Sequence, residues 1–176
     1  MRPLALLPAA SLVFLWTLAL WLWPHLPEQI PLHFDGAGAP DRFGARTPWN
    51  WFLLPGIATA LVGLFAFALP PWIASLARNN SAYLSVPRKE DFARLTPDAR
   101  VRAVSSVGVM LQVIAAELAL LFSVMLYGTE RVANGVWPGL PTAMVFGAFG
   151  LLLSTTLVWL PLFLKAVERE LAQAEG

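Results

Sequence analysis

Residues 51–76 read WFLLPGIATALVGLFAFALPPWIASL and contain no Asp, Glu, Lys or Arg. A helix needs about 20 apolar residues to cross roughly 30 Å of hydrocarbon. Within lipid, a helix satisfies its backbone polar groups inside one segment, whereas an isolated strand does not. The stretch therefore predicts a membrane-spanning helix.

Three other apolar stretches reach a similar length, at about residues 3–23, 104–127 and 138–164. The composition agrees, because 57% of the residues are hydrophobic and only 13% are charged, against about 25% charged in a typical soluble domain. Mean hydropathy is +0.63. We predict a single membrane domain over residues 1–176, an all-α integral membrane four-helix bundle with the lipid bilayer as its solvent.

The first apolar stretch begins after Arg2, as the apolar core of a secretory signal peptide would. Signal peptidase, however, requires small residues at its cleavage site, and this run ends in Trp21, Leu22 and Trp23. We therefore expect residues 3–23 to be retained as the first span.

Lys and Arg are distributed unevenly between the two sides that four spans create, nine on one side and three on the other. The nine are Arg2, Arg78, Arg88, Lys89, Arg94, Arg100, Arg102, Lys165 and Arg169, and the three are Arg42, Arg46 and Arg131. Cytoplasmic segments carry the excess of these residues. We therefore predict a multi-pass plasma-membrane protein with both termini and the connector of residues 77–103 in the cytoplasm, and with the loop of residues 24–50 outside.

The predicted outer loop is too patterned for a simple spacer. Residues 30–34 are typical of a short extended segment, and residues 35–36 and 40–41 have the chemistry of turns. Its glycines suggest positive φ angles or close backbone approach, and they are Gly36, Gly38 and Gly44. We expect a short structured extracytoplasmic loop between the first two helices.

The predicted cytoplasmic connector contains a helix start. Thr96 suits the N-cap, Pro97 the first turn, and Asp98 the positive end of the helix dipole. Residues 87–95 either form an amphipathic helix, with Phe92 and Leu95 toward lipid, or remain a solvated linker.

Residues 26–44 follow the order L-P-x-x-I-P-x-H-F-x-x-x-G-x-P-D-x-x-G. The order is carried by Leu26, Pro27, Ile30, Pro31, His33, Phe34, Gly38, Pro40 and Asp41, with Gly44 following. It resembles the signature of domain-of-unknown-function family 1648 (DUF1648), a module of bacterial membrane proteins that include the N-terminal part of SdpI-type toxin-immunity proteins. The resemblance covers roughly residues 20–65, and it implies a non-enzymatic sensory, immunity or accessory role.

Six loop residues are candidates for contacting a partner or for structuring the loop, namely Pro31, His33, Phe34, Gly38, Pro40 and Asp41. We interpret the side chains of His33 and Asp41 mainly as forming hydrogen bonds to backbone groups, which would fix the loop to the bundle. The alternative is that they form a surface that contacts a ligand. A metal site over His33, Asp35 and Asp41 is disfavoured, because such sites usually take three or four ligands at tight spacing. We predict no metal and no cofactor.

Glu117 is the single charged residue within residues 104–127. A carboxylate at bilayer depth costs about 2.5–3.5 kcal/mol or more unless it is paired. Its candidate partners are Gln112 on the same helix and Ser154, Thr155 or Thr156 on the last one. Glu117 and Gln112 thus form a candidate intramembrane polar site, which either couples proton or cation movement or holds two helices together as a hydrogen-bonded neutral pair.

Several function classes are excluded or disfavoured. The chain has no cysteine and a formal net charge of +1, which excludes thiol catalysis and disfavours a nucleic-acid partner. Both histidines lie in the predicted outer loop, away from the candidate serines, so no Ser-His-Asp catalytic set assembles. We predict a protein that is not an enzyme, whose outer loop contacts a peptide or membrane-protein partner. The alternative is a small proton- or cation-coupled transporter or permease subunit that uses Glu117, and the oligomeric state stays open.

Overall fold

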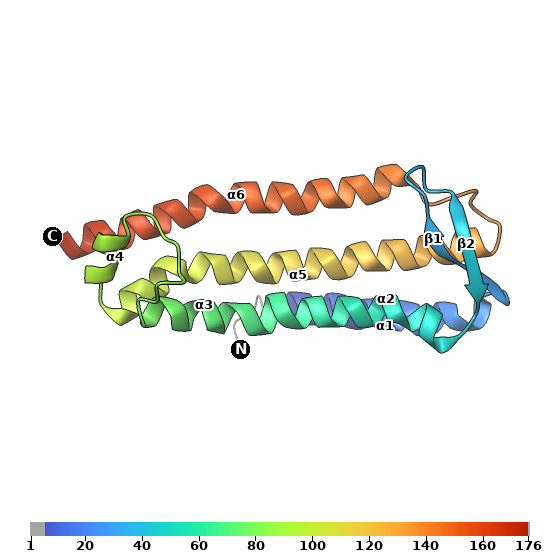
Figure 1. Ribbon diagram of the computed structural model, residues 1–176, viewed down its shortest axis with the longest axis horizontal. Helices are drawn as coiled ribbons and strands as arrows, with labels where there is room; N and C mark the ends of the chain where they lie inside the picture. The colour runs from blue at the N-terminus through green and yellow to red at the C-terminus, as the bar shows by residue number, and fades with distance from the viewer. Residues whose placement is uncertain (1–5, 176) are drawn as a thin grey trace.

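The computed structural model describes residues 6–175, in which four long helical segments run side by side (Figure 1). The elements are α1 Leu6–Leu22, the 3₁₀ turn η2 Trp23–His25, β1 Gln29–Phe34, β2 Pro40–Ala45, α2 Pro48–Val62, the π-helical turn η3 Gly63–Ala68, α3 Leu69–Arg78, α4 Lys89–Arg94, α5 Pro97–Ala133 and α6 Thr142–Glu175. The predicted start of the first span at residue 3, and Arg2, lie outside the described residues.

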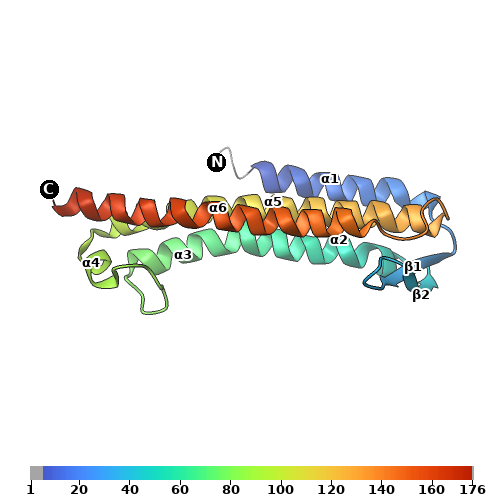
Figure 2. The same ribbon diagram turned by 90° about the horizontal axis from the view of Figure 1, so that it is seen from above.

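Four helical segments are long and apolar enough to cross a membrane. They are Leu6–His25, Pro48–Arg78, Pro97–Ala133 and Thr142–Ala174. Their direction alternates, so the beginning of α1 and the end of α6 point toward the end of the bundle that carries α4 (Figures 1 and 2). We call this the α4 end. The opposite end, with β1, β2 and the α5–α6 loop of residues 134–141, is the hairpin end. The predicted four-helix bundle is confirmed.

Helix α5 is the central helix, because α1, α2, α3 and α6 all pack against it. Figure 1 shows α6 on one side of α5 and α1, α2 and α3 on the opposite side. Small side chains of α5 are buried at these contacts, including Ala103, Ala115, Ala116 and Ala119. Small residues let helix backbones approach closely, which is the usual basis of helix association in lipid.

The structured loop between the first two spans is an antiparallel β-hairpin. The extended segment predicted at residues 30–34 is confirmed within β1. Residues 40–41 were predicted as a turn, and this is wrong, because β2 begins at Pro40, paired with Phe34. The Asp35 carboxylate accepts from the backbone N–H groups of Ala37 and Ala39, each at 2.9 Å. The turn is therefore complete before Pro40.

Prolines determine the local shape of two spans. The second span is continuous through α2, η3 and α3, and its π-helical turn directly precedes Leu69 and Pro70. Proline lacks a backbone N–H, and a local π turn re-satisfies the groups that it leaves free. Helix α6 begins at Thr142 and not near residue 138 as predicted, because two prolines and a glycine occupy residues 138–141.

A hydrophobic core lies at the α4 end. Two side chains there point in a different direction from the one expected. Thr96 caps α5 as predicted, accepting a hydrogen bond from the Ala99 N–H at 3.3 Å. Phe92 and Leu95, expected to face lipid, are buried at 1% and 4% exposure. They pack against Ala77, Ala99, Ala103, Val104, Val167 and Leu171. Helix α4 thus closes a small protein core between α3, α5 and α6.

Gly38 anchors the hairpin turn to the α5–α6 loop. Its carbonyl accepts a hydrogen bond from the Leu140 N–H at 2.8 Å. Its φ of +85° lies in the left-handed region, and a Cβ at this position would collide with the Leu140 carbonyl oxygen. Gly36, two residues earlier in the same turn, has open space where a Cβ would stand. Of the three glycines named from the sequence, Gly38 has the positive φ, and Gly44 closely approaches Leu32.

We predict that Gly38→Ala destabilises the protein by about 1–3 kcal/mol, the usual cost of placing a side chain in a strained backbone conformation. Thermal unfolding in mild detergent measures this effect. Gly36→Ala is the matched control and should leave the midpoint unchanged. Equal midpoints for the two variants would contradict the described docking of the hairpin.

Candidate functional site

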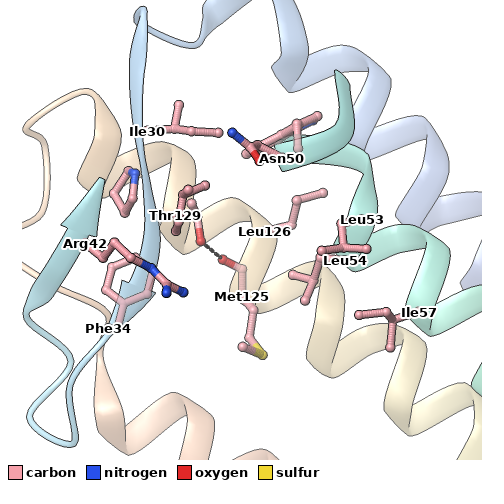
Figure 3. A pocket seen from close by; sticks show the side chains of 13 residues that line it. Ile30, Phe34, Arg42, Asn50, Leu53, Leu54, Ile57, Met125, Leu126 and Thr129 are labelled. Atoms are coloured by element: carbon pink, nitrogen blue, oxygen red, sulfur yellow. Dashed lines mark hydrogen bonds between the residues drawn. The ribbon is translucent and has the colours of Figure 1, made fainter. Parts of the chain in front are cut away.

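A pocket of about 320 Å³ lies beneath the hairpin, between β1, β2, α2 and α5 (Figure 3). It is lined by Ile30, Pro31, Leu32, Phe34, Arg42, Asn50, Trp51, Leu53, Leu54, Ile57, Met125, Leu126 and Thr129. We call it the hairpin pocket. Small-molecule sites are typically concave and mostly apolar, with a few polar groups that set orientation, and this lining has that character.

Hydrogen bonds hold the walls of the hairpin pocket in place. The Trp51 indole Nε1 donates to the Ala19 carbonyl at 2.9 Å, which ties α2 to α1. Thr47 caps α2 by accepting from the Asn50 N–H at 3.1 Å. The Asn50 Nδ2 group donates to the Ala45 carbonyl at 2.8 Å. The end of β2 and the start of α2 are therefore one rigid unit.

Arg42 differs from the other two basic residues at the hairpin end. Arg46 donates to the Leu26 carbonyl at 2.7 Å and lies over the Trp23 ring. Arg131 forms an ion pair with Glu130 at 2.5 Å. The Arg42 side chain has no ion pair or hydrogen bond with any of residues 6–175. Figure 3 shows its guanidinium group reaching from β2 toward the hairpin pocket.

A second pocket of about 320 Å³ lies on the other side of β1, toward α6. Its lining comprises Leu32, His33, Phe34, Asp35, Gly36, Gly38, Met125, Leu140, Thr142, Val145 and Phe146. Leu32, Phe34 and Met125 line both pockets. The strand β1 therefore separates two apolar hollows at the same end of the bundle.

His33 and Asp41 contact each other and not the backbone as expected. His33 Nδ1 lies 2.6 Å from Asp41 Oδ1, across the two strands, with the two side chains 57% and 47% exposed. The backbone contacts expected of them belong instead to Asp35, inside the turn. Among residues 6–175, no three His, Asp or Glu side chains gather closely enough to hold a metal ion.

The remaining four loop candidates have structural positions in the hairpin. Pro31 is buried on β1 and lines the hairpin pocket, and Phe34 is half-buried and lines both pockets. Gly38 is buried against Leu140, and Pro40 begins β2. All six candidates from the sequence therefore lie in one hairpin, and two of them line the hairpin pocket.

These hairpin residues lie within a segment that has known relatives. Residues 10–59 match the family described as domain of unknown function, DUF1648. The DUF1648 segment covers most of α1, the hairpin and most of α2. The chain is also 40% identical over 47 residues to an uncharacterized protein of Archaeoglobus fulgidus, a match that covers 27% of this chain and 25% of that relative. The chain thus spans about a quarter of that relative's length. No solved structure matches this chain.

The predicted DUF1648 resemblance is confirmed for this segment, whereas the likeness to SdpI-type proteins stays a prediction. The DUF1648 segment supplies β1, β2 and the α2 wall of the hairpin pocket, and α5 supplies the remaining wall. The pocket is therefore built from the family module together with a helix outside it.

The intramembrane polar site pairs Glu117 with α6. The Thr155 hydroxyl donates to Glu117 Oε1 at 2.6 Å. Thr155 is one of the candidate partners that the sequence offered for Glu117. Within residues 6–175 the hydroxyls of Ser154 and Thr156 donate instead to carbonyls of their own helix. Gln112 is half-buried on α5 and forms no hydrogen bond with Glu117 in the described part of the chain. Glu117 Oε2 is buried without a hydrogen-bond partner among the described residues.

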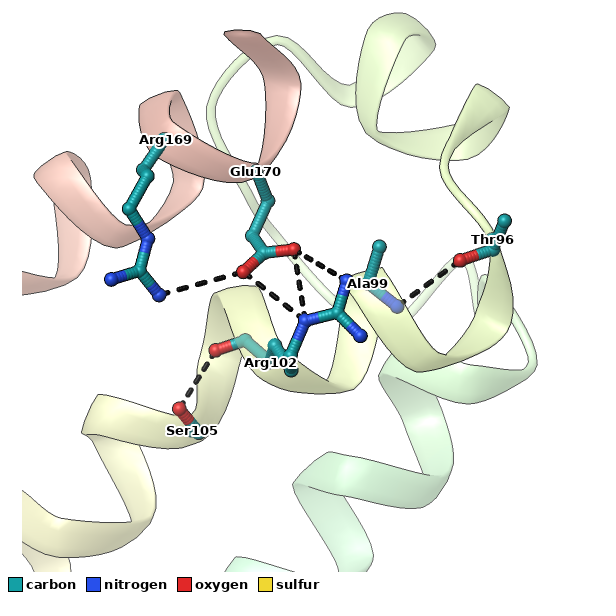
Figure 4. A network of polar contacts seen from close by, with 6 residues as sticks. All are labelled: Thr96, Ala99, Arg102, Ser105, Arg169 and Glu170. Carbon is teal, nitrogen blue, oxygen red and sulfur yellow. Dashed lines mark hydrogen bonds and ion pairs between the residues drawn. The ribbon is translucent and has the colours of Figure 1, made fainter. Parts of the chain in front are cut away.

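Two buried carboxylates were not among the candidate residues named from the sequence. Glu130 at the hairpin end is 1% exposed and is held by Arg131 and by Asn134 Nδ2, which donates at 2.8 Å. Glu170 at the α4 end is 3% exposed and accepts from Arg102 Nη2 at 2.8 Å, with Arg169 3.5 Å away (Figure 4). Glu170 is held across two helices by Arg102 of α5, whereas the partners of Glu130 lie one and four residues farther along the chain.

We predict that Thr155→Val lowers the stability of the bundle by about 1 kcal/mol, because it removes the donor that satisfies Glu117 between two helices. Thermal unfolding in detergent provides the measurement. Thr156→Val is the matched control, since the Thr156 hydroxyl is bonded within its own helix. A larger loss for Thr156→Val than for Thr155→Val would contradict the interhelical role.

Proposed function

We propose that this chain is a non-enzymatic accessory, sensory or immunity protein of the plasma membrane. Its hairpin end contacts a peptide or another membrane protein outside the cell, and its termini lie in the cytoplasm. The distribution of nine and three basic residues supports this orientation, and an even number of spans supports having both termini on one side.

The observation that carries the proposal is the free edge of β2. The sheet has two strands, so among the described residues one edge of β2 has no strand beside it. An open edge presents unpaired N–H and C=O groups, and extended peptides bind to such edges by adding a strand. Phe43 in the middle of β2 is 54% exposed and offers an apolar contact at the same place.

The proposed partner contact predicts a specific effect of a Phe43 substitution. A dedicated partner should co-purify with the full chain in mild detergent, and Phe43→Asp should abolish this by placing a charge on the contact strand. Tyr83→Asp is the control, because Tyr83 is 91% exposed in the segment between α3 and α4. Figure 1 shows α4 at the end of the bundle opposite the hairpin.

Both variants should retain the unfolding midpoint of the unsubstituted chain, since both positions are exposed. Partner recovery that Phe43→Asp leaves unchanged, or that both variants reduce equally, would refute the proposed contact strand. Isolation of homodimers alone would refute the dedicated partner.

Glu117 supports a second candidate function, a small proton- or cation-coupled transporter or permease subunit. Carboxylates inside spans usually mark ion or proton pathways. One oxygen of Glu117 is bonded to Thr155, and the other is buried without a partner among the described residues. A proton or a cation would satisfy this second oxygen.

The transport candidate predicts that Glu117→Gln, which is nearly isosteric, abolishes a proton- or cation-dependent flux in proteoliposomes while the protein remains folded. Glu168→Gln is the control, because Glu168 is exposed beyond the predicted last span. Flux that is absent from the unsubstituted chain, or that Glu117→Gln retains, would remove this candidate.

A further inference from the structure

The hairpin pocket is continuous with the lateral surface of the bundle. Leu53 and Ile57 line it, and each is also 44% exposed on the outside of α2. The same two residues line an adjoining shallow hollow with Pro48, Trp49, Phe52, Gly56 and Ala60. In a span this outer surface faces lipid, so a molecule within the bilayer can reach the pocket from the side.

The polar residues that line the hairpin pocket, Arg42, Asn50 and Thr129, lie toward its hairpin end beside apolar residues of β1, and its deeper lining is apolar. Arg42 lies in the middle of β2 and Asn50 in the first turn of α2, and Figure 3 shows them on different sides of the pocket. Ile57 lies two turns farther along α2, about 10 Å deeper at 1.5 Å per residue. Met125 and Leu126 of α5 form the opposite apolar wall. This is the polarity profile of the headgroup and first acyl segment of a lipid.

Arg42 supplies a positive charge that no described residue neutralises. The other basic residues of the hairpin end are engaged by Leu26, Trp23 and Glu130. Guanidinium groups bind phosphate and carboxylate through charge-assisted hydrogen bonds. An anionic group at the mouth of the pocket would pair with Arg42.

We propose that the hairpin pocket binds one anionic phospholipid from the leaflet at the hairpin end, with the phosphate at Arg42 and an acyl chain between α2 and α5. A lipid fits better than a peptide, because peptide backbone entering at the level of Ile57 would lose its hydrogen bonds in hydrocarbon. This site shares β2 with the proposed partner contact but uses a different side chain. Arg42 lines the hairpin pocket and Phe43 does not, so the two residues can be varied independently.

The test uses the full chain in nanodiscs that contain a phosphatidylglycerol carrying a photoreactive diazirine in one acyl chain. A phosphatidylcholine with the same labelled chain is the comparison. Cross-linked positions are mapped by mass spectrometry. Residues 53–57 and 125–129 should be labelled roughly fivefold more by phosphatidylglycerol than by phosphatidylcholine, because choline offsets the phosphate charge in phosphatidylcholine, whereas phosphatidylglycerol presents a net negative charge to one Arg.

Arg42→Gln should reduce this preference at residues 53–57 and 125–129 to about one. Arg94→Gln should preserve it, because Arg94 is an exposed cation at the α4 end. Ile57→Trp should reduce labelling by both lipids by narrowing the lateral opening. Val13→Trp should not, because Val13 is 66% exposed on α1 and lies outside the pocket lining.

A preference that persists in Arg42→Gln would overturn the assignment of the headgroup. Labelling confined to other surfaces, with the pocket residues unmodified, would overturn the lipid site and leave the pocket to a protein segment. Unfolding midpoints measured for all four variants identify any loss of labelling that comes from misfolding. Co-purification with Phe43→Asp is a separate readout, so this proposal and the proposed partner contact can fail independently.

Discussion

The close approach of small side chains along α5 is the contact on which the architecture depends. Apolar surface gains little by leaving lipid for protein, so helices associate through tight packing and a few polar contacts. The buried alanines at 103, 115, 116 and 119 let α5 serve as the common neighbour of α1, α2, α3 and α6. The Glu117–Thr155 hydrogen bond adds one polar link to α6, which otherwise buries few of its side chains inside the protein.

The two ends of the bundle are stabilised differently. At the α4 end, Phe92 and Leu95 close a core between helices, and the Arg102–Glu170 ion pair crosses from α5 to α6. At the hairpin end, an apolar cluster that includes Ile30, Trp51 and Leu126 is joined by hydrogen bonds to two backbone carbonyls, from the Leu140 N–H to Gly38 and from the Trp51 indole to Ala19. Both candidate pockets next to β1 lie at this end. The rigid hairpin is thus the part of the molecule best placed to bind something.

The proposed functions use different chemistry at different depths. The free edge of β2 offers backbone hydrogen bonds to an extended peptide, and Arg42 offers a charge to a headgroup at the bilayer surface. Glu117 offers a carboxylate oxygen inside the bundle. The edge and Arg42 both belong to β2 but use different groups, the backbone of the strand and one side chain, and Glu117 lies on α5. Each proposal therefore depends on its own groups, and none requires the others.

The sequence by itself determined the four spans, the hairpin's extended first strand, the Thr96 cap and a short set of candidate partners for Glu117, from which the structure selected Thr155. Each depends on local composition or on a single residue type in a fixed position. Only the tertiary structure decided that Pro40 begins a strand, that Phe92 and Leu95 face protein, and that His33 pairs with Asp41. It also decided that Glu130 and Glu170 are buried and that Arg42 borders a pocket. The physical reason is that hydrocarbon requires a span to be apolar and helical, which can be read from local sequence. The direction of a side chain beyond the span depends on which distant segment packs against it.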